Sequence, residues 1–180
     1  MRTQGAITNA DTTDVELLAD AAREAGLTVA AAESLTSGLL ATRIGAGKSA
    51  SVWFRGAVIA YQTSVKQALL GLPAGVDPCS SECAVTLAQN VRRMLAADVA
   101  VSTTGIGGPD PQDGHAPGTV YLGWSTSTSS GYRRLNLSGN PEEVIEQAAR
   151  VAIQLLTEIT TTPTGPARDE DATPGPVDSA

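Results

Sequence analysis

The sequence predicts a single α/β domain, a three-layer α/β/α sandwich built on a mixed β-sheet. Segments whose apolar residues recur with helical spacing alternate with short apolar runs typical of buried strands. This alternation favours a mostly parallel sheet covered by helices on both faces. The last two strand-like runs are separated only by a Ser/Thr/Gly turn, so they are expected to pair with each other and make the sheet mixed.

The first half of the predicted domain contains two strands, each followed by a helix. Apolar residues keep a helical period from Thr13 to the natural stop at Gly26, and the buried run 27–32 reads as a strand. A polar turn over 33–38 leads into a helix over 39–44. The elements expected next are a strand over 56–61, a short helix through Lys66 to Leu70, and a long helix opened by residues 78–81, capped by Ser80 or Ser81, that continues to about Ala97.

The second half is expected to supply three strands and the final helix. A buried strand over 98–104 is followed by a Gly/Pro/Asp-rich loop over 105–118. The paired strands cover 119–125 and 132–137, and Pro141 suits the first position of a helix that continues to Ile159. The predicted order is therefore α-β-α-β-α-α-β-β-β-α.

Composition limits the location and the partners that are expected. Residues 1–11 and 161–180 are too polar to bury apolar surface and are expected to be disordered, which leaves a folded domain over 12–160. The net charge of −7 disfavours nucleic acid and anionic membranes as partners. Nothing at the start resembles a signal peptide, so a cytoplasmic location is expected. Two cysteines, Cys79 and Cys83, and the single His115 are too few for a zinc site, so no metal or other cofactor is expected.

Ser34 lies where a strand turns into a helix, a position at which backbone N–H groups lack partners. Such donors can stabilise an oxyanion while a serine attacks a carbonyl. The local sequence equally allows Ser34, Thr36 or Ser37 to be a simple helix cap. The base for a serine nucleophile could be Lys66, one of only two lysines, because it follows the next strand and is expected at the same edge of the sheet.

The loop after the third strand begins T-G-I-G-G-P at residues 104–109 and lets backbone approach a ligand closely. Tight turns use the same residues, so the glycines alone do not define a site. Asp110 and Asp113 could bind a cation, but they are expected to stabilise the turn.

Together these segments resemble the CinA C-terminal domain family, which includes nicotinamide-nucleotide amidohydrolases of the PncC type. The family pattern A-E-S-x-T-G-G-L corresponds to A-E-S-L-T-S-G-L at 32–39, and W-F-x-G-G-V-V-A-Y-S-x-x-x-K corresponds to W-F-R-G-A-V-I-A-Y-Q-T-S-V-K at 53–66. T-G-x-A-G-P corresponds to residues 104–109, and P-x-G-T-V-Y to residues 116–121. Order and spacing hold from about residue 13 to 160.

The resemblance implies an often oligomeric hydrolase that converts nicotinamide mononucleotide to nicotinate mononucleotide and ammonia without a metal. Ser34 would be the nucleophile, Lys66 its base, and the N–H groups of the 34–38 turn the oxyanion donors. The implied binding residues are Glu33, Thr36, Ser37, Gly38, Ser51 (or Ser49 in another alignment), Arg55, Tyr61, Thr104 and Gly105. A small nucleotide is the implied partner, together with further copies of the chain.

The sequence also departs from the family pattern. Many members carry G-D-R-x-x-V-R before the last helix, whereas residues 139–145 read G-N-P-E-E-V-I, without either arginine. Arg55, Arg133 or Arg134 could replace them. Two alternatives to mononucleotide hydrolysis therefore stay open: a non-catalytic nucleotide-binding or protein-interaction paralogue, and an amidohydrolase for a related amide without the phosphate.

Overall fold

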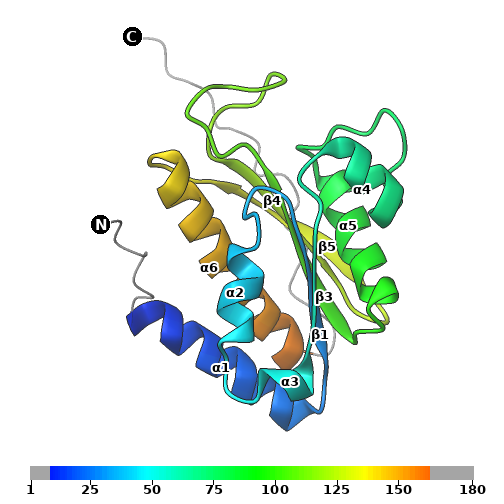
Figure 1. Ribbon diagram of the computed structural model, residues 1–180, viewed down its shortest axis with the longest axis vertical. Helices are drawn as coiled ribbons and strands as arrows, with labels where there is room; N and C mark the ends of the chain where they lie inside the picture. The colour runs from blue at the N-terminus through cyan, green and yellow to red at the C-terminus, as the bar shows by residue number, and fades with distance from the viewer. Residues whose placement is uncertain (1–8, 163–180) are drawn as a thin grey trace.

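The computed structural model describes residues 9–162, which form one α/β unit around a five-stranded sheet (Figure 1). The strands are β1 (Val29–Glu33), β2 (Phe54–Ile59), β3 (Val99–Gly105), β4 (Thr119–Ser125) and β5 (Ser130–Asn136). Their spatial order is β2-β1-β3-β4-β5. β1 is parallel to both of its neighbours, whereas β4 is antiparallel to β3 and β5, so the predicted mixed sheet is confirmed.

Helices cover both faces of the sheet, as expected for a three-layer sandwich. One face is covered by α1 (Asn9–Ala25), α2 (Leu39–Gly45), α3 (Ala50–Trp53) and α6 (Pro141–Thr161), and the other by α4 (Thr63–Leu70) and α5 (Ser81–Met94) (Figure 1). The central strand β1 faces both layers: Val29 and Ala31 join the core under α1 and α6, while Ala30 and Ala32 join the core under α4 and α5. A strand buried on both faces needs an unbroken apolar run, and this explains the alanine-rich sequence.

Helix α5 lies unusually close to the sheet at Gly123 of β4. A Cβ atom at this position would lie 2.0 Å from the carbonyl oxygen of Ala84 in α5. The same carbonyl accepts a hydrogen bond of 2.6 Å from the hydroxyl of Ser102 in β3. Glycine and a small polar residue thus hold α5 close against β3 and β4.

Several element boundaries differ from those predicted, each for a local reason. Helix α1 begins at Asn9, so residues 9–11, expected to be disordered, are helical. Strand β1 starts two residues late because the N–H of Leu27 closes α1 by donating to Ala22. Helix α5 ends at Met94 rather than near Ala97, because Ala96 takes a left-handed conformation with φ 49°.

One helix was not predicted. The single turn α3 is too short to show a helical period, and it is held by the buried Trp53, whose indole N–H donates to the carbonyl of Lys48. The predicted cap of α5 is confirmed as Ser80, which accepts from the N–H of Cys83. Helix α6 continues to Thr161, which falls within the tail expected to be disordered over 161–180. Residues 1–8 and 163–180 of the two expected tails lie outside the described residues.

We expect Gly123→Ala to lower the free energy of unfolding by about 1–3 kcal/mol, because the added methyl group forces α5 away from β4. Chemical denaturation measures this difference. Gly45→Ala is the control: its added Cβ meets nothing within 4 Å, so the stability should stay the same or rise slightly. Equal stabilities for the two variants would contradict the close packing of α5.

Candidate active site

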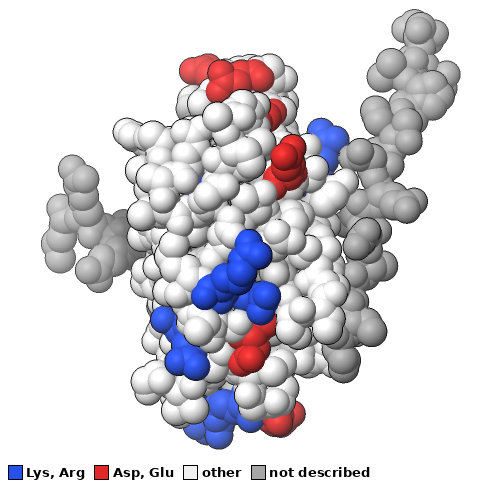
Figure 2. All heavy atoms as spheres, turned by 90° about the vertical axis from the view of Figure 1, so that its right-hand side faces the viewer, with Lys and Arg blue, Asp and Glu red and all other residues white. Residues whose placement is uncertain are grey.

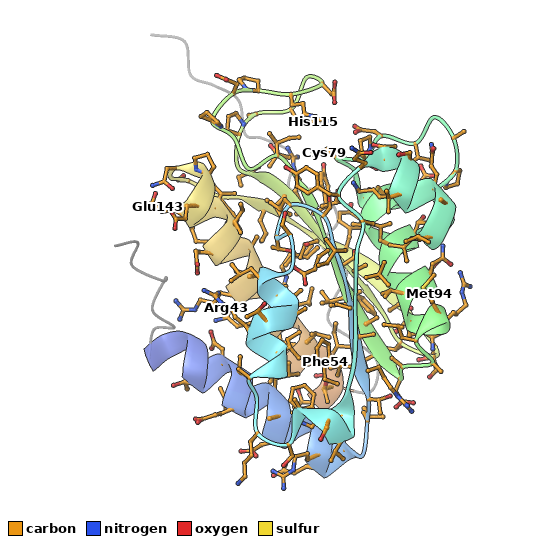
Figure 3. All side chains as sticks on the ribbon, viewed as in Figure 1. Arg43, Phe54, Cys79, Met94, His115 and Glu143 are labelled. Carbon is orange, nitrogen blue, oxygen red and sulfur yellow. The ribbon has the colours of Figure 1, made fainter. Side chains whose placement is uncertain are left out.

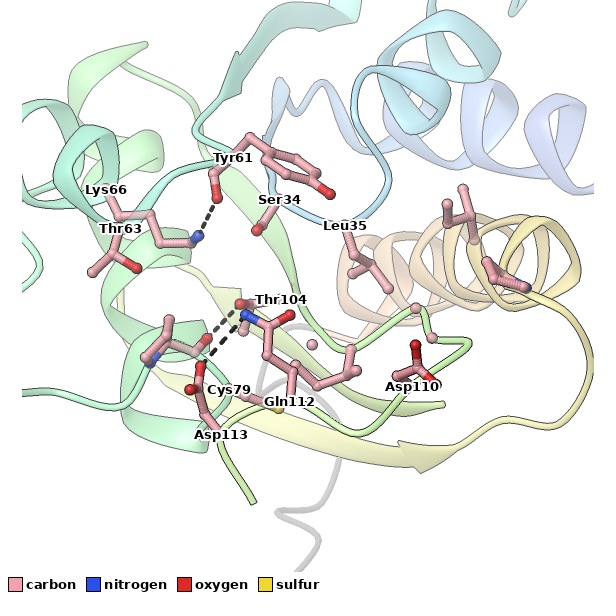
Figure 4. A pocket seen from close by; sticks show the side chains of 17 residues that line it. Ser34, Leu35, Tyr61, Thr63, Lys66, Cys79, Thr104, Asp110, Gln112 and Asp113 are labelled. Carbon is pink, nitrogen blue, oxygen red and sulfur yellow. Dashed lines mark hydrogen bonds between the residues drawn. The ribbon is translucent and has the colours of Figure 1, made fainter. Parts of the chain in front are cut away.

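A pocket of about 300 Å³ lies at the carboxyl ends of the parallel strands (Figure 4). Its volume is at the lower end of the range for small-molecule sites. Of the residues predicted to form the site, it is lined by Ser34, Tyr61, Lys66, Thr104 and Gly105. Ser34 follows β1, Tyr61 and Lys66 follow β2, and Thr104 and Gly105 end β3. The parallel pairing of these strands places all five residues at one edge of the sheet.

Ser34 sits on a tight turn directly after β1. Its N–H donates to the carbonyl of Thr103 in β3 at 3.0 Å, and its carbonyl accepts from the N–H of Ser37 at 3.2 Å. The side chain points into the pocket (Figure 4), and no described residue forms a hydrogen bond with its hydroxyl. Ser34 as a whole is only 7% exposed, and the turn presents its hydroxyl to the pocket, where it is free to meet a ligand.

The carboxylate of Glu33 fixes the direction of this turn. It is fully buried and accepts hydrogen bonds from the N–H groups of Gly38, Leu40 and Ala41 at 2.8, 3.2 and 2.8 Å. Gly38, the N-cap of α2, has no side chain with which to cap the helix, so Glu33 caps it from the end of β1. Glu33 was predicted to bind substrate, but it does not line the pocket and instead anchors the turn.

Three further turn residues also hold its shape rather than lining the pocket. The hydroxyl of Thr36 is 2.7 Å from that of Thr103 in β3, and both are buried. Ser37 and Gly38 take positive φ values of 47° and 100°, which the sharp entry into α2 requires. These three residues thus have a structural role in the turn, and their contact with substrate stays a prediction.

Lys66, in the first turns of α4, is only 3% exposed. Its ammonium nitrogen donates to the carbonyl oxygen of Tyr61 at 2.9 Å, and within residues 9–162 it has no carboxylate partner. Burial lowers the pKa of Lys66, an effect that the nearby Cys83 only partly opposes. Figure 4 shows the amine and the Ser34 hydroxyl on the same side of the pocket, pointing toward one another.

The end of β3 and the loop that follows it (105–118) form the wall of the pocket opposite Ser34 and Lys66. The Thr104 hydroxyl donates to the carbonyl of Pro78 at 2.5 Å. Gly105 has φ 149°, and a Cβ there would lie 2.3 Å from the carbonyl oxygen of Thr119, so only glycine fits. Asp113 lies at positive φ in a two-residue turn closed by backbone hydrogen bonds between Gln112 and His115, which agrees with the expected turn.

Two residues predicted to bind substrate lie far from the pocket. Ser51 is in α3, and Arg55 follows Phe54, which pairs with Val29 at the beginning of β1, whereas Ser34 follows its end. Figure 3 accordingly shows Phe54 low on the sheet and Cys79, a pocket residue, near the top. Neither residue, nor the alternative Ser49, lines this pocket, and their contact with substrate stays a prediction.

The pocket also contains residues that the sequence did not indicate. Pro141 and Ile145, one helical turn apart at the start of α6, form an apolar part of its wall. Cys79 contributes a buried thiol, and burial raises its pKa to about 11, so the thiol stays protonated and is a poor nucleophile near neutral pH. Cys83 is buried as well, in agreement with two small apolar side chains near a helix start.

These features define a class of protein: a mixed-sheet α/β domain with a serine and a buried lysine in a pocket at the carboxyl ends of its parallel strands. The family model described as the CinA C-terminal domain matches residues 11–160, and the chain belongs to this family. Relatives named competence-damage inducible protein occur in Bacillus velezensis (38% identity over 150 residues) and Geobacillus kaustophilus (39% over 142). These matches cover 81% and 76% of this chain but 36% and 34% of the relatives, so the chain spans about a third of their length.

Solved structures give the same assignment. A CinA superfamily protein from Klebsiella pneumoniae aligns with a TM-score of 0.80 and 25% identity, covering 83% of this chain and 97% of that one. One from Escherichia coli aligns with a TM-score of 0.79 and 25% identity, covering 86% and 94%.

Residues 9–162 contain no group of three or more His, Cys, Asp or Glu side chains arranged to hold a metal ion. No helix in this part of the chain has the length and apolar character needed to cross a membrane.

We expect Glu33→Gln to lower the free energy of unfolding by about 1–3 kcal/mol, because the amide NH₂ replaces an acceptor that faces three N–H donors. Thermal or chemical denaturation measures the loss. Glu142→Gln, at an exposed position in the first turn of α6, makes the same chemical change and should cost less than about 0.5 kcal/mol. A Glu33→Gln protein as stable as this control would show that the cap is dispensable.

Proposed function

We propose that the chain is a Ser/Lys amidohydrolase that cleaves the carboxamide of a nicotinamide-type substrate. The observation that carries the proposal is the hydroxyl of Ser34, without a partner in the described part of the chain, facing the desolvated amine of Lys66 in one pocket. A buried amine with a lowered pKa can be neutral and accept a proton, as a general base must. Membership of the CinA C-terminal domain family supports the proposal.

The proposed reaction has two halves. Lys66 takes the proton of Ser34 as the oxygen attacks the amide carbon, and the protonated lysine then gives the proton to the departing ammonia. The acyl-enzyme ester is hydrolysed by a water that Lys66 deprotonates, which releases the carboxylate and restores Ser34. No metal or cofactor takes part.

The hydrogen bonds of the turn reduce the number of N–H groups that could bind the oxyanion. The N–H groups of Ser34, Ser37 and Gly38 are already bonded to Thr103, Ser34 and Glu33 respectively. Those of Leu35 and Thr36 have no acceptor in the described part of the chain, and Leu35 lines the pocket. Because Thr36 does not line the pocket, we assign the N–H group of Leu35 to the tetrahedral oxyanion.

Nicotinamide mononucleotide is the reference substrate, because it is the one that the family resemblance implies. Its products would be nicotinate mononucleotide and ammonia. Tyr61, which lines the pocket and is 66% exposed, offers an aromatic face on which a pyridinium ring can stack.

Purified full-length protein is expected to release ammonia from a nicotinamide-type carboxamide, and Ser34→Ala is expected to abolish the release. A coupled ammonia assay measures both. Thr63→Ala, which removes another hydroxyl of the pocket lining, is the matched control and should retain activity. Full activity in Ser34→Ala would exclude Ser34 as the nucleophile, and binding without release by the wild-type protein would favour the non-catalytic paralogue.

Lys66→Met is expected to reduce kcat by ~10²–10⁴, the usual contribution of a general base. The variant should not be less stable, because a methionine removes the cost of burying an amine. Steady-state kinetics together with denaturation separate the two effects. A rate within a few-fold of wild type would contradict the assignment.

The pH dependence follows from the lowered pKa of Lys66. The base works only when deprotonated, so activity should be present above the pKa of Lys66 in the folded protein and be lost as the pH falls through it. That transition should lie below 10.5, the value of an ordinary lysine. A pH profile of kcat/KM measures it, and the transition should be absent from the residual activity of Lys66→Met. A transition at or above 10.5 would show that burial does not tune this amine.

A further inference from the structure

The charged groups around the pocket do not suit an anionic ligand. Apart from the buried Lys66, no lysine or arginine among residues 9–162 lines it, whereas Asp110 and Asp113 do. Figure 4 shows Asp110 on the side of the pocket away from Lys66. On the face shown in Figure 2, acidic side chains gather at the upper end, where the 105–118 loop lies, and most basic side chains lie lower.

The three arginines that could replace the missing arginines of the family pattern do not line the pocket. Arg133 forms an ion pair with Glu158 of α6 at 2.8 Å, and Arg55 lies at the opposite end of the sheet. Arg134 is the one whose charge reaches the pocket wall, where it partly offsets the rise that burial causes in the pKa of Cys79. Its guanidinium lies over the ring of Tyr121, 5.9 Å from the centroid, and does not line the pocket.

The start of α6, which contributes to the pocket wall, does not offer an anion site either. Asn140 and Glu143 form a capping box: the Asn140 side chain accepts from the N–H of Glu143, and the Glu143 carboxylate accepts from the N–H of Asn140. Glu142 and Glu143 also place two carboxylates in this first turn. A phosphate here would meet like charge instead of the positive end of a helix.

The surface that α6 does present is apolar. Pro141 and Ile145 line the pocket together with Leu35 and Ile106. Placing a phosphate against these side chains would remove its hydration without supplying hydrogen bonds. An uncharged sugar or an apolar group has no such penalty.

We infer that the pocket selects an unphosphorylated carboxamide, either neutral or cationic, whose distal part lies against Pro141 and Ile145. The nucleoside of nicotinamide, with its pyridinium charge and no phosphate, has this chemistry. The inference rests on the proposed function for the reacting carboxamide, but the selectivity can be measured without turnover.

The test compares binding of nicotinamide riboside and nicotinamide mononucleotide to the full-length Ser34→Ala protein by calorimetry. At low ionic strength the riboside is expected to bind at least ~10-fold more tightly, because juxtaposed like charges are costly. The preference should narrow in high salt. Equal or tighter binding of the mononucleotide, or no binding of either compound, would overturn the inference.

Ammonia release by the wild-type protein separates this inference from the proposed function. We expect kcat/KM to favour the riboside by a similar factor. A binding preference for the riboside without release from either compound would contradict the proposed function and leave the selectivity intact.

A charge introduced at Ile145 tests the position of the distal group. Ile145→Arg is expected to shift the ratio of the two affinities at least ~10-fold toward the mononucleotide, since it places a cation in the pocket. Glu24→Gln changes the net charge by the same amount at an exposed position of α1, away from this pocket, so it should leave the ratio unchanged. An unchanged ratio in Ile145→Arg, or an equal shift in both variants, would show that the distal group does not lie against α6.

Discussion

The buried carboxylate of Glu33 is the constraint on which the site depends. A carboxylate with no exposure to water must accept several hydrogen bonds, and here the N–H groups at the start of α2 supply them. Because Glu33 ends β1, this interaction fixes both ends of the turn between strand and helix. The residues between them have to leave the strand sharply, so that Ser34 faces the pocket and Leu35 and Thr36 keep N–H groups without acceptors in the described part of the chain.

The order of strands then brings the other groups to this turn. β1 lies between β2 and β3, and all three run in the same direction, so their carboxyl ends form one edge. Lys66 enters from α4 after β2, and Gly105 comes from the end of β3. The close approach of α5 to Gly123 belongs to the same arrangement, because α5 packs on β3 and β4 and begins two residues after Cys79, which lines the pocket.

Sequence patterns predicted the fold and the shared location of Ser34 and Lys66 because both depend on short-range signals. Apolar runs mark the strands, and the carboxyl-end rule for parallel strands places Ser34 and Lys66 at one edge. The sequence pattern did not show that Glu33 caps α2, because the N–H groups that bind its carboxylate face it only when α2 folds back toward the end of β1. Arg55 lies away from the pocket because of the register of β2 against β1, which no local motif encodes. The place of Ile145 in the pocket wall also depends on long-range contacts, because four elements (α5, β3, β4 and β5) separate α6 from the helix that carries Lys66.

The base proposed at Lys66 and the ligand charge inferred for the pocket share one requirement: no negative charge should be bound close to the amine. A lysine acts as a base only while it stays neutral, and burial is the main cause of its lowered pKa. A phosphate dianion bound in the same small pocket would favour the protonated amine and oppose that effect. A cationic pyridinium has the opposite influence and helps to keep the amine neutral. The residues 139–145, which replace the arginine-bearing family segment with an apolar wall and a capped helix start, therefore fit a pocket whose base is kept active by the absence of bound negative charge.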